Sequence, residues 1–198
     1  MSIDVKTLVS ETALTASDTG TGVRINHRTG HTIHYIYTDV TSGVVTFVDG
    51  DVNVANNTVT DTAHGLVTGD KIALTTGGVL PAGLSATNYF IIRVDANTYK
   101  FATTLVNAQA GTAVDITAAA GGGTHTVTPA ALSGSIKLQM SYDGTNWADV
   151  PSSTIAISAT GSTLQNYRDY NSLELRSVYT HTAGRIDISA TYTAQVIL

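Results

Sequence analysis

An alternating run of apolar and polar side chains, closed by a turn, constrains the fold of this chain more than any other feature. Between Ile136 and Tyr142 every second residue is apolar, which is the period-2 pattern of a half-buried β-strand. The next four residues, Asp143 to Asn146, tolerate turn dihedrals, and the chain returns through Trp147 to Pro151, which cannot donate to a sheet ladder. We therefore expect a β-hairpin whose inner face is formed by Ile136, Leu138, Met140 and Tyr142.

The same alternation predicts strands in the flanking sequence. It is longest from Ile186 to Leu198, and it also marks Ile155–Ile157 and Leu173–Arg176. Val23–Ile25 and Ile33–Tyr37 alternate on either side of a short turn and predict a second hairpin. The first twenty residues are expected to form an extended arm or an edge strand. Strands that are apolar on one face need a second sheet to cover them, so the sequence favours an antiparallel all-β sandwich.

The composition is that of strands and turns with few charges. The chain has 33 Thr, 18 Gly and only 2 Glu. Charged residues make up 13% of the sequence, against about 25% in an average soluble domain. Much of the surface must therefore consist of Thr, Ser, Ala and Gly. We expect other subunits to cover part of that surface, and a monomer with a Thr-rich polar surface is the alternative.

Net charge, cysteine content and the absence of long apolar segments limit the kinds of partner that we expect. A net charge of -5 argues against nucleic-acid binding, because that affinity comes mainly from clustered Lys and Arg. The sequence contains no Cys, so it can form neither disulfides nor Cys-ligated metal sites. The first residues lack the pattern of a secretion signal, and no apolar run approaches the ~18 residues of a membrane span. We expect a protein made in the cytoplasm and not inserted in a membrane, as suits a virion component released by host lysis.

The residue pattern of the sequence changes after Asp39, and the dipeptide Ser42–Gly43 recurs at Ser133–Gly134. Joining the flanks would leave a short connection between two strands of one sheet. We therefore predict that residues 43–132 form a small β domain inserted into a hairpin loop of a host domain, formed by 1–42 and 133–198. Loop tips tolerate such insertions because closure costs grow slowly with length. One continuous sandwich is the alternative.

Short strands separated by turns are predicted inside residues 43–132. The segment Ala63–Asp70 contains two glycines and reads as a tight turn, Asp95–Thr98 has hairpin-turn chemistry, and Leu105–Gly111 predicts a helical turn. The strands are expected at Val44–Val48, Asn57–Thr62, Lys71–Thr75, Tyr89–Val94, Tyr99–Thr103, Val114–Thr117 and Thr124–Thr128.

Two segments have some features of metal sites. Asp49–Asn53 begins like an EF-hand calcium loop, but Val54 stands where the loop needs glycine and Thr60 where it needs glutamate. An acidic turn is the better interpretation. His27, His31 and His34 are close in sequence, yet strand positions three apart point to opposite faces, so His31 and His34 are not expected to share an ion. If the chain forms trimers with this hairpin near the axis, one histidine from each subunit would meet there.

No pattern indicates catalysis. The sequence has no Gly-x-Ser-x-Gly elbow and no Cys nucleophile, and Gly121–Gly123 is not followed by the lysine of a phosphate-binding loop. Most Asp residues lie in turns, and no pair stands out as the two carboxylates of a glycosidase. We expect no enzyme activity and no cofactor, and a hydrolase that trims surface polysaccharide is the weaker alternative.

Aromatic and amide side chains gather near the predicted hairpin turn. Trp147, Tyr142, Asp143 and Asn146 have the chemistry to stack on a sugar and to hydrogen-bond it, and Tyr167, Tyr170, Asn166 and Asn171 lie in a second such stretch. The preferred interpretation is that Trp147 fills the core. In that case Trp147→Ala costs about 3–5 kcal/mol of stability.

Two parts of the chain resemble proteins of tailed-bacteriophage virions. Residues 44–127, with AHGLVTGDKIALTT, LPAGLSATNYFIIRVDANTYKFATT and AGTAVDITAAAGGGTHTV, resemble a small β domain that recurs in phage tail, fibre and head-decoration proteins. The stretches SGSIKLQMSYDGTNWADV and LELRSVYTHTAGRIDISATY are similar to immunoglobulin-like sandwiches on phage capsids and tails. The resemblance implies an immunoglobulin-like host domain and a structural or adhesive role.

The expected function is that of a non-catalytic virion protein. The resemblance and the low charge favour a capsid decoration or cement protein that binds the major capsid protein or other virion proteins and projects its inserted domain. A homo-oligomer is expected, and a trimer would suit a spike. The alternative is a tail or fibre component that binds a host-surface glycan.

Overall fold

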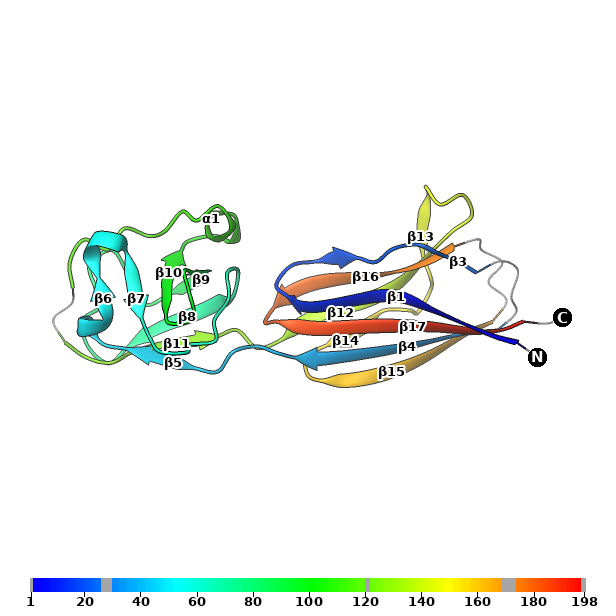
Figure 1. Cartoon of the computed structure of the whole chain (residues 1–198), viewed down its shortest axis with the longest axis horizontal. Coiled ribbons are helices and arrows are strands. Elements are labelled where there is room, and N and C mark those ends of the chain that lie inside the picture. Colours follow the sequence, from blue (N-terminus) through cyan, green and yellow to red (C-terminus); the bar gives the residue numbers. More distant parts are fainter. Residues whose placement is uncertain (1, 26–29, 120–121, 169–173, 197–198) are drawn as a thin grey trace. The chain divides into compact units, whose positions relative to one another are not determined.

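The chain folds into two compact β units. The computed structural model describes residues 2–25, 30–119, 122–168 and 174–196. Unit 1 combines the two ends of the chain, Met1–Val40 and Leu132–Leu198, and unit 2 is the continuous segment Thr41–Ala131 (Figure 1). All strand pairs are antiparallel, which confirms the predicted all-β class.

Unit 1 consists of two sheets. The four-stranded sheet has the order β1 (Ser2–Leu14), β17 (Ile186–Val196), β4 (Gly30–Asp39) and β15 (Gly161–Arg168). The six-stranded sheet has the order β13 (Trp147–Asp149), β12 (Ser133–Ser141), β16 (Glu174–Ala183) and β2 (Asp18–Thr19), with β14 (Ile155–Ile157) paired to β12 and β3 (Val23–Arg24) paired to β16. The predicted N-terminal edge strand is therefore β1, and the predicted long C-terminal strand is β17.

One apolar core joins the two sheets of unit 1. Tyr35 and Tyr192 from the four-stranded sheet and Ile136 and Tyr179 from the six-stranded sheet are almost fully buried in the same cluster. Within β17 the buried residues alternate as predicted, at Ile186, Ile188, Ala190, Tyr192 and Ala194. The predicted sandwich is confirmed at this level, because each sheet covers the apolar side of the other.

Two predicted strand connections are wrong. Val23–Ile25 and Ile33–Tyr37 do not form a hairpin, since β3 pairs with β16 in one sheet and β4 pairs with β17 and β15 in the other. The strands that flank the inserted segment, β4 and β12, also belong to different sheets. Alternation identifies the buried side of a strand, but it does not identify the partner strand.

Unit 2 is therefore inserted at a crossover between sheets and not in a hairpin loop. The connection between β16 and β17 makes the same crossover beside it: Ser133 pairs with Ala183, Asp39 pairs with Ile186, and the Val40 amide donates to the Arg185 carbonyl at 3.0 Å. Leu132 packs into the unit 1 core, so it belongs with the host segment and not with the insertion.

Unit 2 contains one seven-stranded sheet. Its order is β5 (Val45–Phe47), β11 (His125–Pro129), β8 (Lys71–Thr76), β9 (Asn88–Arg93), β10 (Thr98–Ala102), β7 (Thr58–Thr60) and β6 (Val52–Asn53). Two 3-10 turns, η1 (Asp49–Asp51) and η2 (Val54–Asn56), and one short helix, α1 (Leu105–Gln109), complete it. The core includes Phe47, Ile72, Tyr99 and Phe101. The predicted helical turn and all but one of the predicted strands are confirmed within a few residues.

The exception is Val114–Thr117, which is not a strand. Its backbone N–H groups are satisfied one at a time: Val114 donates to the Phe101 carbonyl, Ile116 to the Asn57 side chain and Thr117 to the Ala82 carbonyl. Since these three donors find separate acceptors, they form no ladder, although the alternation of Val114 and Ile116 looks like a strand in the sequence.

Candidate functional site

The turn predicted to contribute to a sugar site is held together by its own polar groups. The Asp143 carboxylate accepts hydrogen bonds from the backbone N–H groups of Asn146 at 2.7 Å and Thr145 at 2.8 Å, and from the Asn146 side-chain amide at 2.6 Å. These donors, the Asn146 backbone first, lower the pKa of Asp143 well below its usual range. The polar groups of Asp143 and Asn146 are thus directed at each other within the turn.

Tyr142 does not lie on the inner face, as the alternation predicted. It is 62% exposed, whereas Ser141 is buried. Strand β12 ends at Ser141, whose hydroxyl accepts from the Gly144 amide at 2.9 Å and donates to Asp143 at 3.0 Å. The turn folds over Ser141, and the period-2 pattern therefore stops one residue before Tyr142.

Trp147 is not part of the core, so the preferred interpretation of this residue is wrong. It pairs with Ser141, on the face of β12 opposite to the buried Leu138. Its indole ring is half-buried, and the Arg176 guanidinium carbon lies 4.1 Å from the ring centroid, in a cation–π contact. A Cβ atom on Gly22 would lie 2.8 Å from the indole, so the chain passes close to the ring there.

The other aromatic residues of the predicted sugar site are separated. Tyr167 is buried in the unit 1 core, and Asn166 lies on the outer side of β15, where its side chain accepts from the Thr32 hydroxyl at 2.7 Å. Tyr170 and Asn171 lie outside the described residues. Of the described residues in the two predicted stretches, the turn with exposed Tyr142 and half-buried Trp147 remains as a candidate carbohydrate contact.

The outer side of the six-stranded sheet carries paired charges, and we call it the charged face. Lys137 donates to Asp149 at 2.7 Å, Gln139 donates to the other oxygen of Asp149 at 2.8 Å, and Arg176 donates to Gln139 at 2.9 Å. The Lys137 hydrogen bond is the largest cause of the lowered pKa of Asp149. Beside this chain of contacts, Arg24 lies 3.5 Å from Glu174. Each charged group has an opposite charge or an amide beside it.

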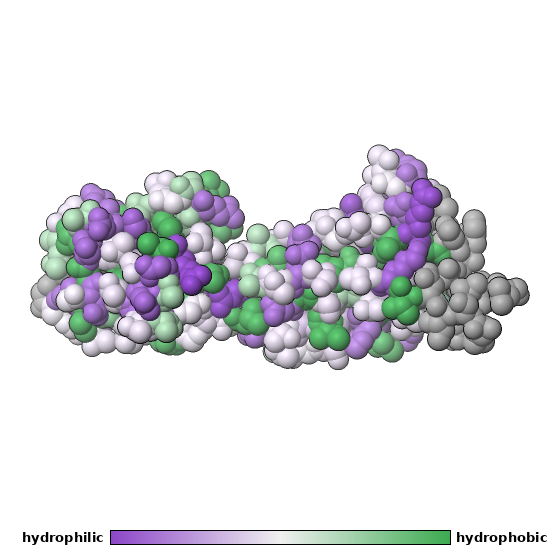
Figure 2. Space-filling model, viewed as in Figure 1, coloured by the Kyte–Doolittle hydropathy of each residue, from purple (hydrophilic) through white to green (hydrophobic). Residues whose placement is uncertain are grey.

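The outer side of the four-stranded sheet is different, and we call its three central rows the uncharged face. Across β1, β17, β4 and β15 the rows are Val5–Thr193–Thr32–Asn166, Thr7–Thr191–His34–Leu164 and Ser10–Ser189–Ile36–Ser162. None of these residues is Asp, Glu, Lys or Arg. Three aliphatic side chains are strongly exposed: Val5 at 60%, Leu164 at 59% and Ile36 at 47%. In the view of Figures 1 and 2, the surface where β1, β17 and β4 run mixes pale and green residues with scattered purple ones.

A shallow hollow marks one end of the uncharged face. It has a volume of about 180 Å³, and its lining includes Ser10, Glu11, Ile36, Thr38, Asp187 and Ser189. Asp187 accepts from the Ala13 amide at 2.7 Å, so one of these carboxylates fixes the local backbone of β1. The hollow lies beside the exposed Ile36.

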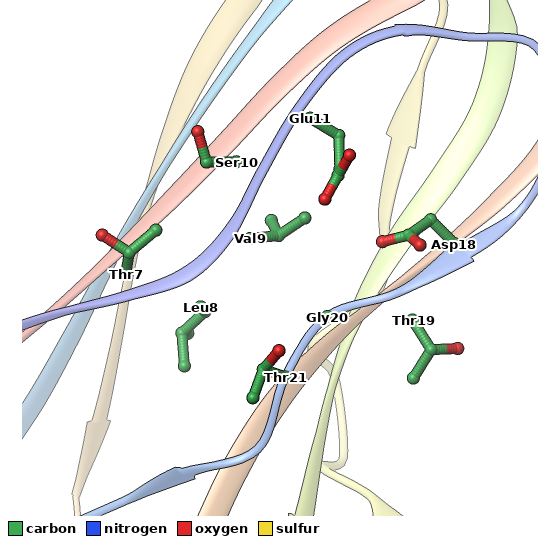
Figure 3. A pocket seen from close by; sticks show the side chains of 9 residues that line it. All are labelled: Thr7, Leu8, Val9, Ser10, Glu11, Asp18, Thr19, Gly20 and Thr21. Carbon is green, nitrogen blue, oxygen red and sulfur yellow. The ribbon is translucent and has the colours of Figure 1, made fainter.

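A second pocket lies between the edges of β1 and β2 (Figure 3). The buried side chains of Leu8 and Val9 come from β1, and Glu11 and Asp18 stand on the two strands that flank the pocket. Its backbone is tightly packed, because a Cβ atom on Gly20 would lie 2.3 Å from the Leu8 carbonyl oxygen. The segment that contains β2 therefore closes this side of the sandwich against β1.

The residues with metal-like spacing are used in the fold. His31 is buried and lies 2.7 Å from the Tyr192 hydroxyl, whereas His34 is exposed, so they point to opposite faces as predicted. His27 lies outside the described residues. The Asp51 carboxylate accepts from the Val48 amide at 2.8 Å, within the 3-10 turn η1. Over residues 2–25, 30–119, 122–168 and 174–196, no group of three His, Asp or Glu residues is placed to hold a metal ion.

One constellation in unit 2 has the order of a catalytic triad. The Thr76 hydroxyl lies 2.8 Å from Nδ1 of His125, and Nε2 of His125 lies 3.3 Å from Asp49. The imidazole is fully buried against Phe47, and the Thr76 hydroxyl also accepts from the Gly78 amide. These contacts connect strands β8 and β11 to the segments at Asp49 and Gly78. Because the imidazole ring is buried, a substrate cannot reach it.

Comparisons with known proteins add little. No protein-family model matches this chain, and no curated protein matches it. Among similar solved structures is VP17, a capsid protein of bacteriophage P23-77, which is 11% identical over 99% of this chain and 98% of that chain, with a TM-score of 0.22. A TM-score this low carries no argument about fold or function. None of the described helices is long and apolar enough to cross a membrane.

Proposed function

We propose that this protein is a non-catalytic structural protein of a tailed-phage virion, specifically a capsid decoration protein that docks through the uncharged face. The observation that carries the proposal is the contrast between that face and the rest of the sandwich. It exposes Val5, Ile36 and Leu164 among hydroxyl side chains, with no Asp, Glu, Lys or Arg in its three rows. Such a surface loses little free energy on leaving water, because no unpaired charge must be desolvated.

The size of the face favours repeated weak binding. With strands ~4.8 Å apart and rows ~6.8 Å apart, its area is roughly 400 Å². Each partner in a standard interface contributes about 800 Å². One copy would therefore bind weakly, whereas many copies on a symmetric shell, or several copies in one oligomer, would gain from avidity. This fits a cement or decoration role better than the role of a tight one-to-one inhibitor or adaptor.

The domain organisation supports the same role. In unit 1 the pair Ser2–Val196 lies at one end of β17, and the pair Asp39–Ile186, next to the chain segment that leads into unit 2, lies at the other end. We infer that unit 1, residues 1–40 and 132–198, forms an immunoglobulin-like docking domain and that unit 2, residues 41–131, forms an independent β domain that the docked protein presents. The presented domain can then change without altering the docking surface.

Binding to particles tests the proposal. Particles that lack this protein are mixed with the purified wild type or with Val5→Lys, and co-sedimented protein is quantified. The substitution places a charge on the uncharged face and should weaken binding at least about tenfold, because the lysine must be desolvated without a partner. The matched control is Val106→Lys in unit 2, where Val106 is 73% exposed, and this variant should bind like wild type. Equal binding by all three proteins would contradict the proposal.

Two further measurements separate the capsid role from its rival. Mass spectrometry of separated heads and tails should find the protein on heads, and a glycan array probed with the purified protein should be blank. Assignment to tails, together with glycan binding that is lost in Trp147→Ala, would instead favour a fibre component that uses the turn at Tyr142–Trp147.

A further inference from the structure

The four-stranded sheet of unit 1 has two edges, and they are protected to different degrees. The edge strand β1 has two register shifts along β17, between Thr7 and Val9 and between Glu11 and Leu14. The neighbouring segment also lies against it: Gly20 packs on the Leu8 carbonyl, and Lys6 donates to the Arg24 carbonyl at 2.6 Å. Bulges, a lysine and a covering segment are the devices that keep natural edge strands from pairing with other chains.

Among the residues that the structure describes, the opposite edge, β15, has no register shift and no lysine, and it contacts a neighbouring segment through the Gln165 side-chain amide, which donates to the Ser153 carbonyl at 3.3 Å. It pairs with β4 in an unbroken register from Gly161 to Arg168, and β4 is its only partner strand among the described residues. From Gly161 to Tyr167 it contains no charged residue and no proline, and Ser162, Leu164 and Asn166 are exposed. A regular, uncharged edge strand of this length is a template for pairing with another strand.

We propose that β15 pairs antiparallel with β15 of a second copy of this chain, which joins the two four-stranded sheets into one continuous sheet. A second copy suits this edge because the segment 161–167 lacks charge, so its self-pairing brings no like charges together even though each chain carries a net charge of -5. Pairing of two identical antiparallel strands about a twofold axis also closes on itself, which gives a dimer and not a fibre.

The dimer would have a direct consequence for surface area. The uncharged faces of the two copies would become one face of roughly 800 Å², estimated from the same strand spacing, which reaches the contribution of one partner to a standard interface. The dimer itself does not depend on the proposed virion role, because it rests only on the edge of β15.

Sedimentation equilibrium of the full chain tests the dimer. Wild type should move from the chain mass of 20.6 kDa towards twice that mass as concentration rises from micromolar to millimolar. The variant Ser162→Lys/Asn166→Lys puts like charges along β15 and should remain a monomer. The control Thr7→Lys/Ser10→Lys adds the same charges to the same sheet face at the protected edge, and should dimerise like wild type. All four positions are exposed, and the one hydrogen bond lost is that from the Thr32 hydroxyl to Asn166, so the stability of both variants should stay within about 1 kcal/mol of wild type.

Hydrogen exchange provides a second readout. Amides between residues 161 and 168 should become slower to exchange at high concentration, while those of β1 should not change. A wild type that stays monomeric would overturn the proposal. Loss of the dimer in both lysine variants would overturn it too, since that result indicates face-to-face stacking, and so would a dimer that persists in both.

Discussion

The two outer faces of the sandwich differ in the side chains that they expose to solvent. On the charged face Lys137, Asp149, Gln139 and Arg176 satisfy one another in a continuous series of contacts. On the uncharged face the hydroxyl side chains surround exposed aliphatic groups, with Ile36 and Leu164 on neighbouring strands. A face whose charges are already paired has little to offer a partner, whereas an uncharged face with exposed aliphatic groups gains from being covered. Between these two faces, the charged side chains therefore lie on the six-stranded sheet, and the three central rows of the four-stranded sheet have none.

The largest difference in the cost of a substitution is expected between a buried and an exposed position of the same strand, β4. Ile33 and Ile36 both lie on β4, but Ile33 is fully buried and Ile36 is 47% exposed. Ile33→Ala should cost about 2–5 kcal/mol because it leaves a cavity between the sheets, whereas Ile36→Ala should cost less than about 0.5 kcal/mol. Denaturant unfolding followed by fluorescence of Trp147, the only tryptophan, reports on unit 1. Equal costs would mean that the outer face is not free of intramolecular packing.

Alkaline pH should weaken the core beneath both faces. Burial raises the pKa of Tyr35 from 10.0 to about 12, against a small opposing effect of the Ser177 hydrogen bond that links the two sheets. A raised folded-state pKa gives stability that is complete below pH 10 and is lost as the pH rises through about 12. The loss is about 2–3 kcal/mol, because each tenfold change in proton affinity between the folded and unfolded chain corresponds to ~1.4 kcal/mol.

Substitution of the tyrosine checks this pH dependence. Stability of Tyr35→Phe should fall less steeply than that of wild type between pH 10 and 12, as measured by denaturant midpoints at each pH. The exposed Tyr142→Phe is the matched control and should follow wild type. A Tyr35→Phe variant with the wild-type slope would mean that the phenol is not held neutral by the core.

The charged face should be sensitive to loss of its central cation. Arg176→Ala removes the cation–π contact with Trp147 and the hydrogen bond to Gln139, and should cost about 1–2 kcal/mol. His34→Ala, on the uncharged face, should cost less than about 0.5 kcal/mol. Because Trp147 lies under the guanidinium, its emission spectrum should also change in the first variant. A neutral Arg176→Ala would mean that the contacts of the charged face do not stabilise unit 1.

A smaller effect is expected at acid pH on the same face. The pKa of Asp149 is lowered, so its contribution is complete above the usual carboxyl value of 3.8 and is lost as the pH falls through the lowered value. Since both side chains of the pair with Lys137 are in partial contact with solvent, Asp149→Asn should cost only about 0.2–1 kcal/mol at neutral pH. The difference from wild type should disappear at high salt and at low pH in denaturant titrations. A difference that persists under both conditions would point to packing and not to charge.

The sequence was sufficient where alternation alone decides the outcome. The period-2 pattern of β17 and of Ile136 to Leu138 predicts the buried sides of these strands, because one side of each must face the other sheet. The alternation predicts the wrong side for Tyr142. Strand β12 ends at Ser141, and the Ser141 hydroxyl forms hydrogen bonds within the turn, so the period-2 pattern does not extend to Tyr142. The sequence predicts Trp147 in the core, but a large aromatic side chain can also lie on the outer side of a sheet. Its pairing with Ser141 places it there, and this pairing cannot be predicted from the sequence.

Long-range pairing and the surface contrast were beyond the sequence. β3 and β4 are adjacent in the chain, but nothing local indicates that they join different sheets. The rows of the uncharged face combine residues from β1, β4, β15 and β17, which are up to 188 positions apart, as Val5 and Thr193 show. A low fraction of charged residues could be counted in the sequence, yet its distribution over two faces depends on that pairing.

The smallest change in the stability of unit 1 is expected when the inserted segment is deleted. If unit 1 folds on its own, removing residues 44–131 and joining Gly43 to Leu132 should change the stability of unit 1 by no more than about 0.5 kcal/mol. Leu132 must be kept because it packs in the core, and Val40–Gly43 then span the ~10 Å between the sheets at about 3.3 Å per residue. The unfolding transition reported by Trp147 should stay cooperative, with the wild-type midpoint. Loss of this transition would show that both faces belong to a host that depends on its insertion, and the two-domain proposal would then fail.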